Sequence, residues 1–218
     1  MNRVKKNIHN IARKAGFDIV RYEPRTHPLA RRKKILSTYQ ISLVLDVGAN
    51  VGQYGQQLRE IGYKGNIVSF EPLSVAFNEL KRRSEQDPVW EVYNFALGDK
   101  NETASINIAG NSFSSSILDI LPSHIKSAPE SAYTGHEEIK VKTLDDIYSD
   151  ITNGSDKVYL KIDTQGFEEN VLMGAEASLK SIDTIQLEMS LIPLYRNGML
   201  FDEMYGLLCR KWICVGGV

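Results

Sequence analysis

Short apolar runs alternate with segments of helical length along most of the chain, and this alternation restricts the fold more than any other feature. The apolar runs predict strands at residues 43–48, 66–72, 89–98, 157–163, 184–189 and 212–218. The segments between them predict helices at residues 52–61, 74–84, 168–181 and 201–210. Such alternation is typical of βαβ units. We therefore expect an α/β, Rossmann-like, doubly wound and mostly parallel sheet, with an extra edge strand at 103–109.

The first 34 residues differ in charge from the rest of the chain. They hold 11 lysines and arginines and two acids, whereas the remaining residues hold 15 basic and 25 acidic side chains. An amphipathic helix is expected at 3–15, a short strand at 17–22 and a helix at 29–39. We therefore separate a basic extension, residues 1–35, from a cofactor-binding domain, residues 36–218. The basic helix 3–15 is either solvated or docks on an anionic membrane surface.

Several classes of protein are disfavoured by composition. The acidic main domain would repel nucleic acid. No apolar run reaches the roughly 18 residues of a membrane span, and the N-terminus lacks the apolar core of a signal peptide. Cys209 and Cys214 fit neither a zinc pattern nor a disulfide framework, so we expect reduced, buried thiols. A cytoplasmic location follows as the expectation, with at most peripheral contact at the inner membrane face.

The stretch "LDVGANVGQYG", residues 45–55, follows the first predicted buried strand. Glycines such as Gly48 and Gly52 let the backbone turn tightly and approach a ligand, and the following helix presents free N–H groups. The dinucleotide pattern G-x-G-x-x-G is absent, which disfavours a nicotinamide-dependent oxidoreductase. Asp46 would repel a pyrophosphate but suits a ligand with an ammonium group; alternatively it is a turn acid that caps the loop.

Two further segments follow predicted strands. Glu71 ends the second strand, where a carboxylate can accept hydrogen bonds from both ribose hydroxyls, unless it is only a strand-end charge. Asn94, Ala96 and Leu97 end the third strand, where they could flank an adenine. Together with the glycine loop, these features describe a site for S-adenosylmethionine.

Four segments, "LDVGANVGQYG", "IVSFEPLS", "LKIDTQGFEENVLMGA" and "IQLEMS", resemble in this order the FkbM family of S-adenosylmethionine-dependent methyltransferases. The resemblance runs from about Leu36 to Leu194. It implies the class I methyltransferase fold with strand order 3-2-1-4-5-7-6, and methyl transfer to oxygen, often of a sugar hydroxyl. It also implies cofactor contacts, which fall into three groups: Asp46, Gly48, Ala49, Asn50, Gly52 and Tyr54 at the methionine end, Glu71 and Pro72 at the ribose, and Asn94, Ala96 and Leu97 at the adenine.

A sugar hydroxyl is a weak nucleophile, so a general base is expected. Asp163 follows the fourth strand and Glu188 ends the fifth, so the two carboxylates could share this role or hold a divalent ion, although no ligand pattern supports a metal. Asp163 could instead cap the following helix. His136 is a further candidate base. Lys161, inside a buried strand, is expected to neutralise nearby acids.

Two regions bear on the acceptor and on activity. Residues 109–117, "AGNSFSSSI", are either a solvated loop or an acceptor-binding lid. Only one strand follows the last predicted helix, so we expect either a sheet that lacks its last strand or a terminal strand in an unusual place. An open edge would favour weak stability or a homodimer. The expected function is O-methyl transfer to a hydroxyl, in a saccharide or glycolipid. The alternative is a protein that binds S-adenosylmethionine without catalysis, disabled by the short C-terminus.

Overall fold

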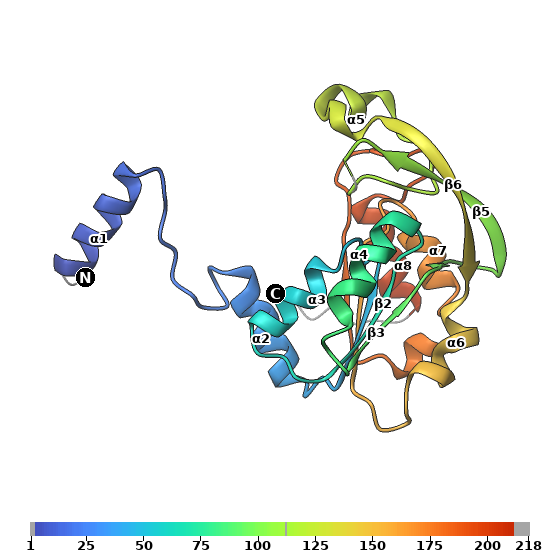
Figure 1. Cartoon of the computed structure of the whole chain (residues 1–218), viewed down its shortest axis with the longest axis horizontal. Coiled ribbons are helices and arrows are strands. Elements are labelled where there is room, and N and C mark those ends of the chain that lie inside the picture. Colours follow the sequence, from blue (N-terminus) through green and yellow to red (C-terminus); the bar gives the residue numbers. More distant parts are fainter. Residues whose placement is uncertain (1–2, 112, 212–218) are drawn as a thin grey trace.

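The computed structural model describes residues 3–111 and 113–211 (Figure 1). Its centre is a parallel five-stranded sheet in the order β3-β2-β1-β7-β8. The strands are β1 (Leu43–Val47), β2 (Asn66–Phe70), β3 (Trp90–Tyr93), β7 (Val158–Ile162) and β8 (Thr184–Leu187). The predicted α/β fold with a mostly parallel sheet is confirmed, and the order corresponds to 3-2-1-4-5 of the expected arrangement.

Helices cover both faces of this sheet because its central strands are apolar on both faces. Alternate residues of β1 enter different cores: Leu45 packs with the layer of α6, α7 and α8, whereas Val44 packs with α2, α3 and α4. The helices are α2 (Pro28–Thr38), α3 (Gln53–Glu60), α4 (Ser74–Ser84), α6 (Leu144–Ile151), α7 (Glu168–Met173) and α8 (Phe201–Lys211). The two layers leave the carboxyl ends of the strands as the place for a site.

A second, three-stranded sheet has the order β4-β6-β5. Its strands are β4 (Ala96–Leu97), β5 (Glu102–Ala109) and β6 (Tyr133–Lys142). The prediction of one strand over 89–98 was wrong, because the chain leaves the central sheet after Tyr93 and β4 pairs with β6 instead. The expected strand at 103–109 exists, but it pairs antiparallel with β6, which the sequence analysis did not identify. In Figure 1, β5 and β6 curve beside the central sheet; α5 (Pro122–Ser127) and the short helix η1 (Pro129–Ser131) lie between them in the chain.

The N-terminal segment contains α1 (Arg3–Lys14), which projects away from the body in Figure 1. The predicted strand at 17–22 was wrong: these residues form no strand, and the side chains of Phe17 and Ile19 are exposed. A strand needs a pairing partner for its backbone, and this segment has no ladder partner among the described strands. The chain joins the body at α2, where Ala30 and Leu36 are buried.

Three further predictions need correction or fall outside the structure. The helix expected over 168–181 ends at Met173, and η2 (Ser178–Ser181) follows. The helical hydrogen bonds are replaced there by bonds to Asp145: its N–H donates to the carbonyl of Gly174, and its carboxylate accepts from the N–H groups of Ala177 and Ser178. Cys209 is exposed, so the expectation of a buried thiol was wrong there. Cys214 and the strand expected at 212–218 lie outside the described residues. Within the described part, no helix is long and apolar enough to cross a membrane.

Candidate active site

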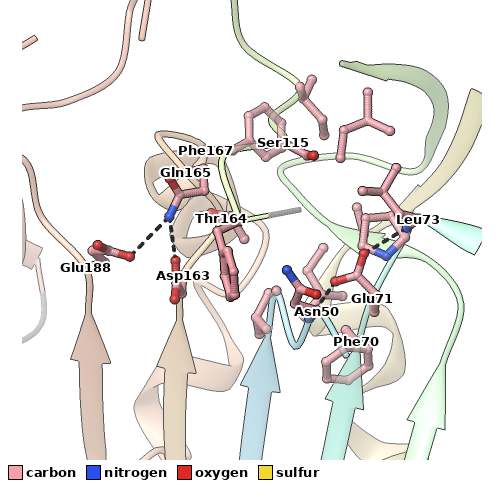
Figure 2. Close-up of a pocket in the computed structure, with 18 residues that line it drawn as sticks. Asn50, Phe70, Glu71, Leu73, Ser115, Asp163, Thr164, Gln165, Phe167 and Glu188 are labelled. Carbon is pink, nitrogen blue, oxygen red and sulfur yellow. Dashed lines mark hydrogen bonds between the residues drawn. The ribbon is translucent and has the colours of Figure 1, made fainter. Parts of the chain in front are cut away.

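A pocket of about 270 Å³ opens where β1, β2, β7 and β8 end (Figure 2). It lies where ligands of doubly wound sheets bind. Its walls come from the glycine loop after β1, the segments after β2 and β7, the second sheet, and the loop that contains residues 113–117. Eight of the residues predicted to form the site line it: Gly48, Asn50, Glu71, Pro72, Ala96, Leu97, Asp163 and Glu188.

The glycine loop packs directly against the end of β7. Gly48 has φ 72°, and a Cβ there would collide with the carbonyl oxygen of Asp163. The N–H groups of Gly48 and Ala49 donate to the carbonyl of Phe70 at 3.1 and 3.0 Å. These contacts tie the loop to β2 and β7 together, so that Asn50 and Asp163 open onto the same pocket.

Glu71 forms one end of the pocket. Its side chain is buried, and its Oε2 and Oε1 atoms accept hydrogen bonds from the backbone N–H groups of Asn50 at 2.8 Å and Leu73 at 2.9 Å (Figure 2). Burial raises the pKa of Glu71 to about 7, although the two hydrogen bonds oppose the shift. A carboxylate has about four acceptor sites, so Glu71 keeps acceptor capacity for a pair of hydroxyls.

Apolar side chains from β2, β4, β5 and two connecting segments form the wall beside Glu71. They are Phe70, Leu73, Ala96, Leu97, Ile106 and Ile117. Asn94 does not line the pocket; its Nδ2 donates to the carbonyls of Glu71 and Pro72 at 3.0 and 2.9 Å and thereby holds the segment after β2. An apolar wall next to a hydroxyl-binding carboxylate can accommodate a nucleobase.

Asp163 and Glu188 lie at the other end of the pocket. The Nε2 atom of Gln165 donates to both, at 2.9 Å to Asp163 and 3.2 Å to Glu188 (Figure 2). Burial opposes ionisation of Asp163, but the charge of Lys161 and hydrogen bonds from its neighbours hold its pKa below the usual value. The hydrogen bond with Asp163, followed by burial, raises the pKa of Glu188 to about 7. When the pair takes up a proton as pH falls, Glu188 is therefore the first of the two acids to be protonated.

Gln165 was not selected from the sequence, although it lies within the quoted stretch "LKIDTQGFEENVLMGA". Its backbone has φ 56°, and the N–H groups of Thr164 and Gly166 on either side both donate to the buried carboxylate of Glu168. Tyr195 donates its hydroxyl to Gln165 Oε1 at 3.0 Å, which orients the amide with Nε2 toward the two acids. The local signal was an amide side chain two residues after the strand-end acid Asp163.

Lys161 and Asp46 are register partners on neighbouring strands below the pocket floor. Their Nζ and Oδ1 atoms are 2.9 Å apart, and both side chains are buried. Lys161 also lies 3.6 Å from Asp163 and donates to the carbonyl of Gly48 at 3.0 Å. The expectation that Lys161 neutralises nearby acids is confirmed. Asp46 does not line the pocket, since it points beneath the loop toward Lys161 and the hydroxyl of Ser69.

Four other predicted site residues also lie outside the pocket lining. Ala49 is buried, and Gly52 lies against Leu80 and Trp90. The hydroxyl of Tyr54 donates to Oε1 of Gln186, a residue of β8, at 3.1 Å. His136 is exposed on β6, in register with a residue of β5, and the structure does not bring it to the two carboxylates.

The loop that contains residues 113–117 covers part of the pocket. Phe113, Ser115 and Ile117 contribute to its lining. Ser116 Oγ donates to the carbonyl of Gln165 at 2.7 Å, which ties this loop to the turn after β7. The interpretation of this loop as a lid rather than a solvated connection is therefore favoured. Among residues 3–111 and 113–211, no three or more His, Cys, Asp or Glu side chains are grouped so that they could hold a metal ion.

Comparisons with known proteins agree with this geometry. The model of the family described as "Methyltransferase FkbM domain" matches residues 46–212. The curated protein "Methyltransferase 1" of Beauveria bassiana is 25% identical over 146 residues. The matched part is 62% of this chain and 59% of that protein, so the chain spans less than two thirds of this relative.

Proposed function

Because this chain belongs to the FkbM methyltransferase domain family, we propose that it is an S-adenosylmethionine-dependent O-methyltransferase that acts on a hydroxyl of a saccharide or glycolipid. One observation carries the proposal: a single pocket has the buried carboxylate of Glu71 at one end and, at the other, two carboxylates bridged by the Gln165 amide. The first suits a nucleoside, and the second suits removal of a proton from an acceptor.

The residues present fit the cofactor. Glu71 would bind the ribose hydroxyls, because each of its oxygens already accepts one backbone N–H and keeps a further acceptor site. Leu97 and Ile106 belong to the apolar wall that would cover the adenine. Gly48 and Asn50 would lie at the methionine end, next to Asp163, whose negative charge suits an ammonium or sulfonium group. When bound, S-adenosylmethionine would supply an electrophilic methyl group on a positively charged sulfur.

Glu188 would act as the general base. In its ionised form it takes the proton that the acceptor hydroxyl loses, and its pKa of about 7 suits a base near neutral pH. Asp163 stays ionised beside Lys161 and keeps the proton affinity of Glu188 high. Gln165 holds the two acids in place through its Nε2 atom.

The character of the pocket entrance supports a hydroxylated acceptor. Ser115 and Gln165 provide neutral polar groups in the pocket lining. The Ser115 hydroxyl accepts from the N–H of Ala109 and can still donate to a sugar oxygen, whereas Gln165 Oε1 keeps one acceptor site for a sugar hydroxyl because its Nε2 is used by the two acids. Phe113, which is largely exposed where it lines the pocket, offers an aromatic face. Aromatic faces and amide groups together suit the mixed apolar and hydroxyl surfaces of a saccharide.

Cofactor binding is the first test. Calorimetric titration with S-adenosylmethionine and S-adenosylhomocysteine should show binding by the wild type. Loss of one or two hydrogen bonds to a charged group should weaken it by about 10- to 100-fold in Glu71→Ala. Glu138→Ala, on the exposed part of β6, is the matched control and should bind as the wild type does. Tight binding by Glu71→Ala would disprove the assignment of the ribose site.

Methyl transfer is the second test. S-adenosylmethionine with a labelled methyl group is incubated with hydroxylated saccharides and glycolipids, and the label is located by mass spectrometry. We expect a new methyl ether in a hydroxyl-bearing acceptor. Label on nitrogen or carbon would contradict O-methyl transfer. Cofactor binding without any transfer, in the wild type as in Glu188→Gln, would favour a non-catalytic binding protein.

A further inference from the structure

Residues 8–22 expose an unusual density of large apolar side chains. Six of them are between 42% and 71% exposed: Ile8, Ile11, Phe17, Ile19, Val20 and Tyr22. We call these six side chains the apolar strip. The strip begins on α1 and continues through the extended segment that follows, and both project from the body in Figure 1. The folded core begins later, at α2, so the described part of the body leaves the apolar strip uncovered.

The same segment is strongly basic. Arg13, Lys14, Arg21 and Arg25 are all exposed, and Arg31, Lys33 and Lys34 on α2 add three more exposed cations. The two acids among the first 34 residues neutralise only two of the 11 cations, since Asp18 lies 3.1 Å from Arg13 and Glu23 lies 3.3 Å from Arg21. An excess of nine positive charges remains. Apolar and cationic side chains are therefore interleaved along one exposed stretch.

This combination identifies the kind of partner. A nucleic acid would use the cations but would leave aliphatic side chains such as Ile8, Ile11 and Val20 in water. An anionic bilayer uses both, since acyl chains take up the apolar groups and phosphate head groups pair with the cations. We propose that the apolar strip and its basic neighbours dock this protein on an anionic lipid surface. The contact extends past the helix into residues 17–22, and it does not depend on the proposed methyl transfer.

Vesicle co-sedimentation of the full chain tests the proposal. Vesicles of phosphatidylcholine alone are compared with vesicles that also contain phosphatidylglycerol. We expect binding to the anionic vesicles only, with loss of binding in high salt. Removal of one basic residue near such a surface weakens binding about 5-fold, so the charge reversal Lys14→Glu/Arg25→Glu should weaken it by about 25-fold or more. The control Lys126→Glu/Lys180→Glu changes net charge equally on exposed sites of the body and should bind more nearly as the wild type does.

The apolar part of the contact is tested separately. Ile11→Ser/Phe17→Ser should reduce vesicle binding, while Val75→Ser should not, although Val75 is even more exposed. Equal binding by all variants, or no binding to anionic vesicles, would overturn the proposal. Two other results would also overturn it. In one, light scattering shows a dimer that becomes monomeric in the Ile11→Ser/Phe17→Ser variant. In the other, the wild type binds an RNA oligonucleotide while anionic vesicles fail to compete.

Discussion

Asp163 and Glu188 end neighbouring parallel strands, and one amide group, Nε2 of Gln165, donates to both at 2.9 and 3.2 Å. The two acids are not equivalent. Asp163 lies near the buried charge of Lys161, whereas Glu188 lies on the solvent side of the pocket. Asp163 is therefore the member of the pair that stays ionised, and Glu188 is the member that gains and loses a proton near neutral pH.

The first prediction concerns the rate of methyl transfer and its dependence on pH. Because Glu188 must be ionised to act as the base and its pKa is about 7, kcat should rise with pH up to about 7 and level off above it. Glu188→Gln should lower kcat by about 10²- to 10⁴-fold. Affinity for S-adenosylhomocysteine should change little in this variant, since Glu71 is at the other end of the pocket. A pH profile that keeps its step near 7 in Glu188→Gln would assign the base elsewhere.

Much of the central sheet could be predicted from the sequence because its strands are buried on both faces. Continuous apolar runs such as "LVLDV" and "VYLKI" have no other stable environment, and both were placed within a residue or two of β1 and β7. The residues directly after such strands then had to meet at one edge. This reasoning correctly brought Glu71, Asp163 and Glu188 to one pocket.

The second sheet could not be predicted in the same way. β6 carries charged or polar side chains at most positions and has no continuous apolar run, and its exposed face gives a weak alternation. The break after Tyr93 depends on the pairing of β4 with β6, which is a contact between distant segments. Asp46 shows a related limit: its ion pair with Lys161 depends on strand register, which local pattern does not reveal.

The second prediction concerns that buried ion pair. Lys161→Met leaves the carboxylate of Asp46 buried without its cation, which should lower the free energy of unfolding by about 3–5 kcal/mol in urea denaturation. Asp46→Asn/Lys161→Met should lose less than Lys161→Met alone. Lys157→Met is the matched control, because Lys157 pairs with Asp183 at 3.0 Å but its side chain is exposed. This substitution should lower the free energy of unfolding by less than about 1 kcal/mol. Additive losses in the double variant would show that the pair has no energetic coupling.

The third prediction links Glu71 to the pH dependence of stability. Its pKa is raised in the folded protein from 4.5 to about 7, so its favourable contribution is fully present below the unfolded pKa and is lost as pH rises through about 7. Glu71→Gln removes this titration. Between about pH 4 and pH 8, the wild type should lose up to about 3 kcal/mol of unfolding free energy relative to Glu71→Gln.

Urea denaturation of both proteins across this pH range measures the effect. The difference between the two curves is the informative quantity, because other titrating groups such as Glu168 are present in both proteins. Glu138→Gln, on an exposed part of β6, controls for the loss of one carboxylate and should follow the wild-type curve. A constant difference between wild type and Glu71→Gln over the whole range would contradict the raised pKa.

The fourth prediction separates backbone strain from the close approach of the glycine loop to β7. Gly48 and Gly62 both have positive φ, 72° and 87°, so alanine should cost each position about 1–2 kcal/mol of backbone energy. They differ in surroundings: a Cβ on Gly62 would have its nearest neighbour, Lys33 Nζ, at 3.9 Å, whereas a Cβ on Gly48 would collide with the carbonyl oxygen of Asp163. Gly62→Ala should therefore lower the free energy of unfolding but leave the binding of S-adenosylhomocysteine unchanged.

Gly48→Ala should lower the free energy of unfolding further. It should also lower methyl transfer by about 100-fold, because the collision displaces Asp163. Equal effects of the two substitutions on unfolding and on transfer would mean that the contact between the glycine loop and β7 does not position the site.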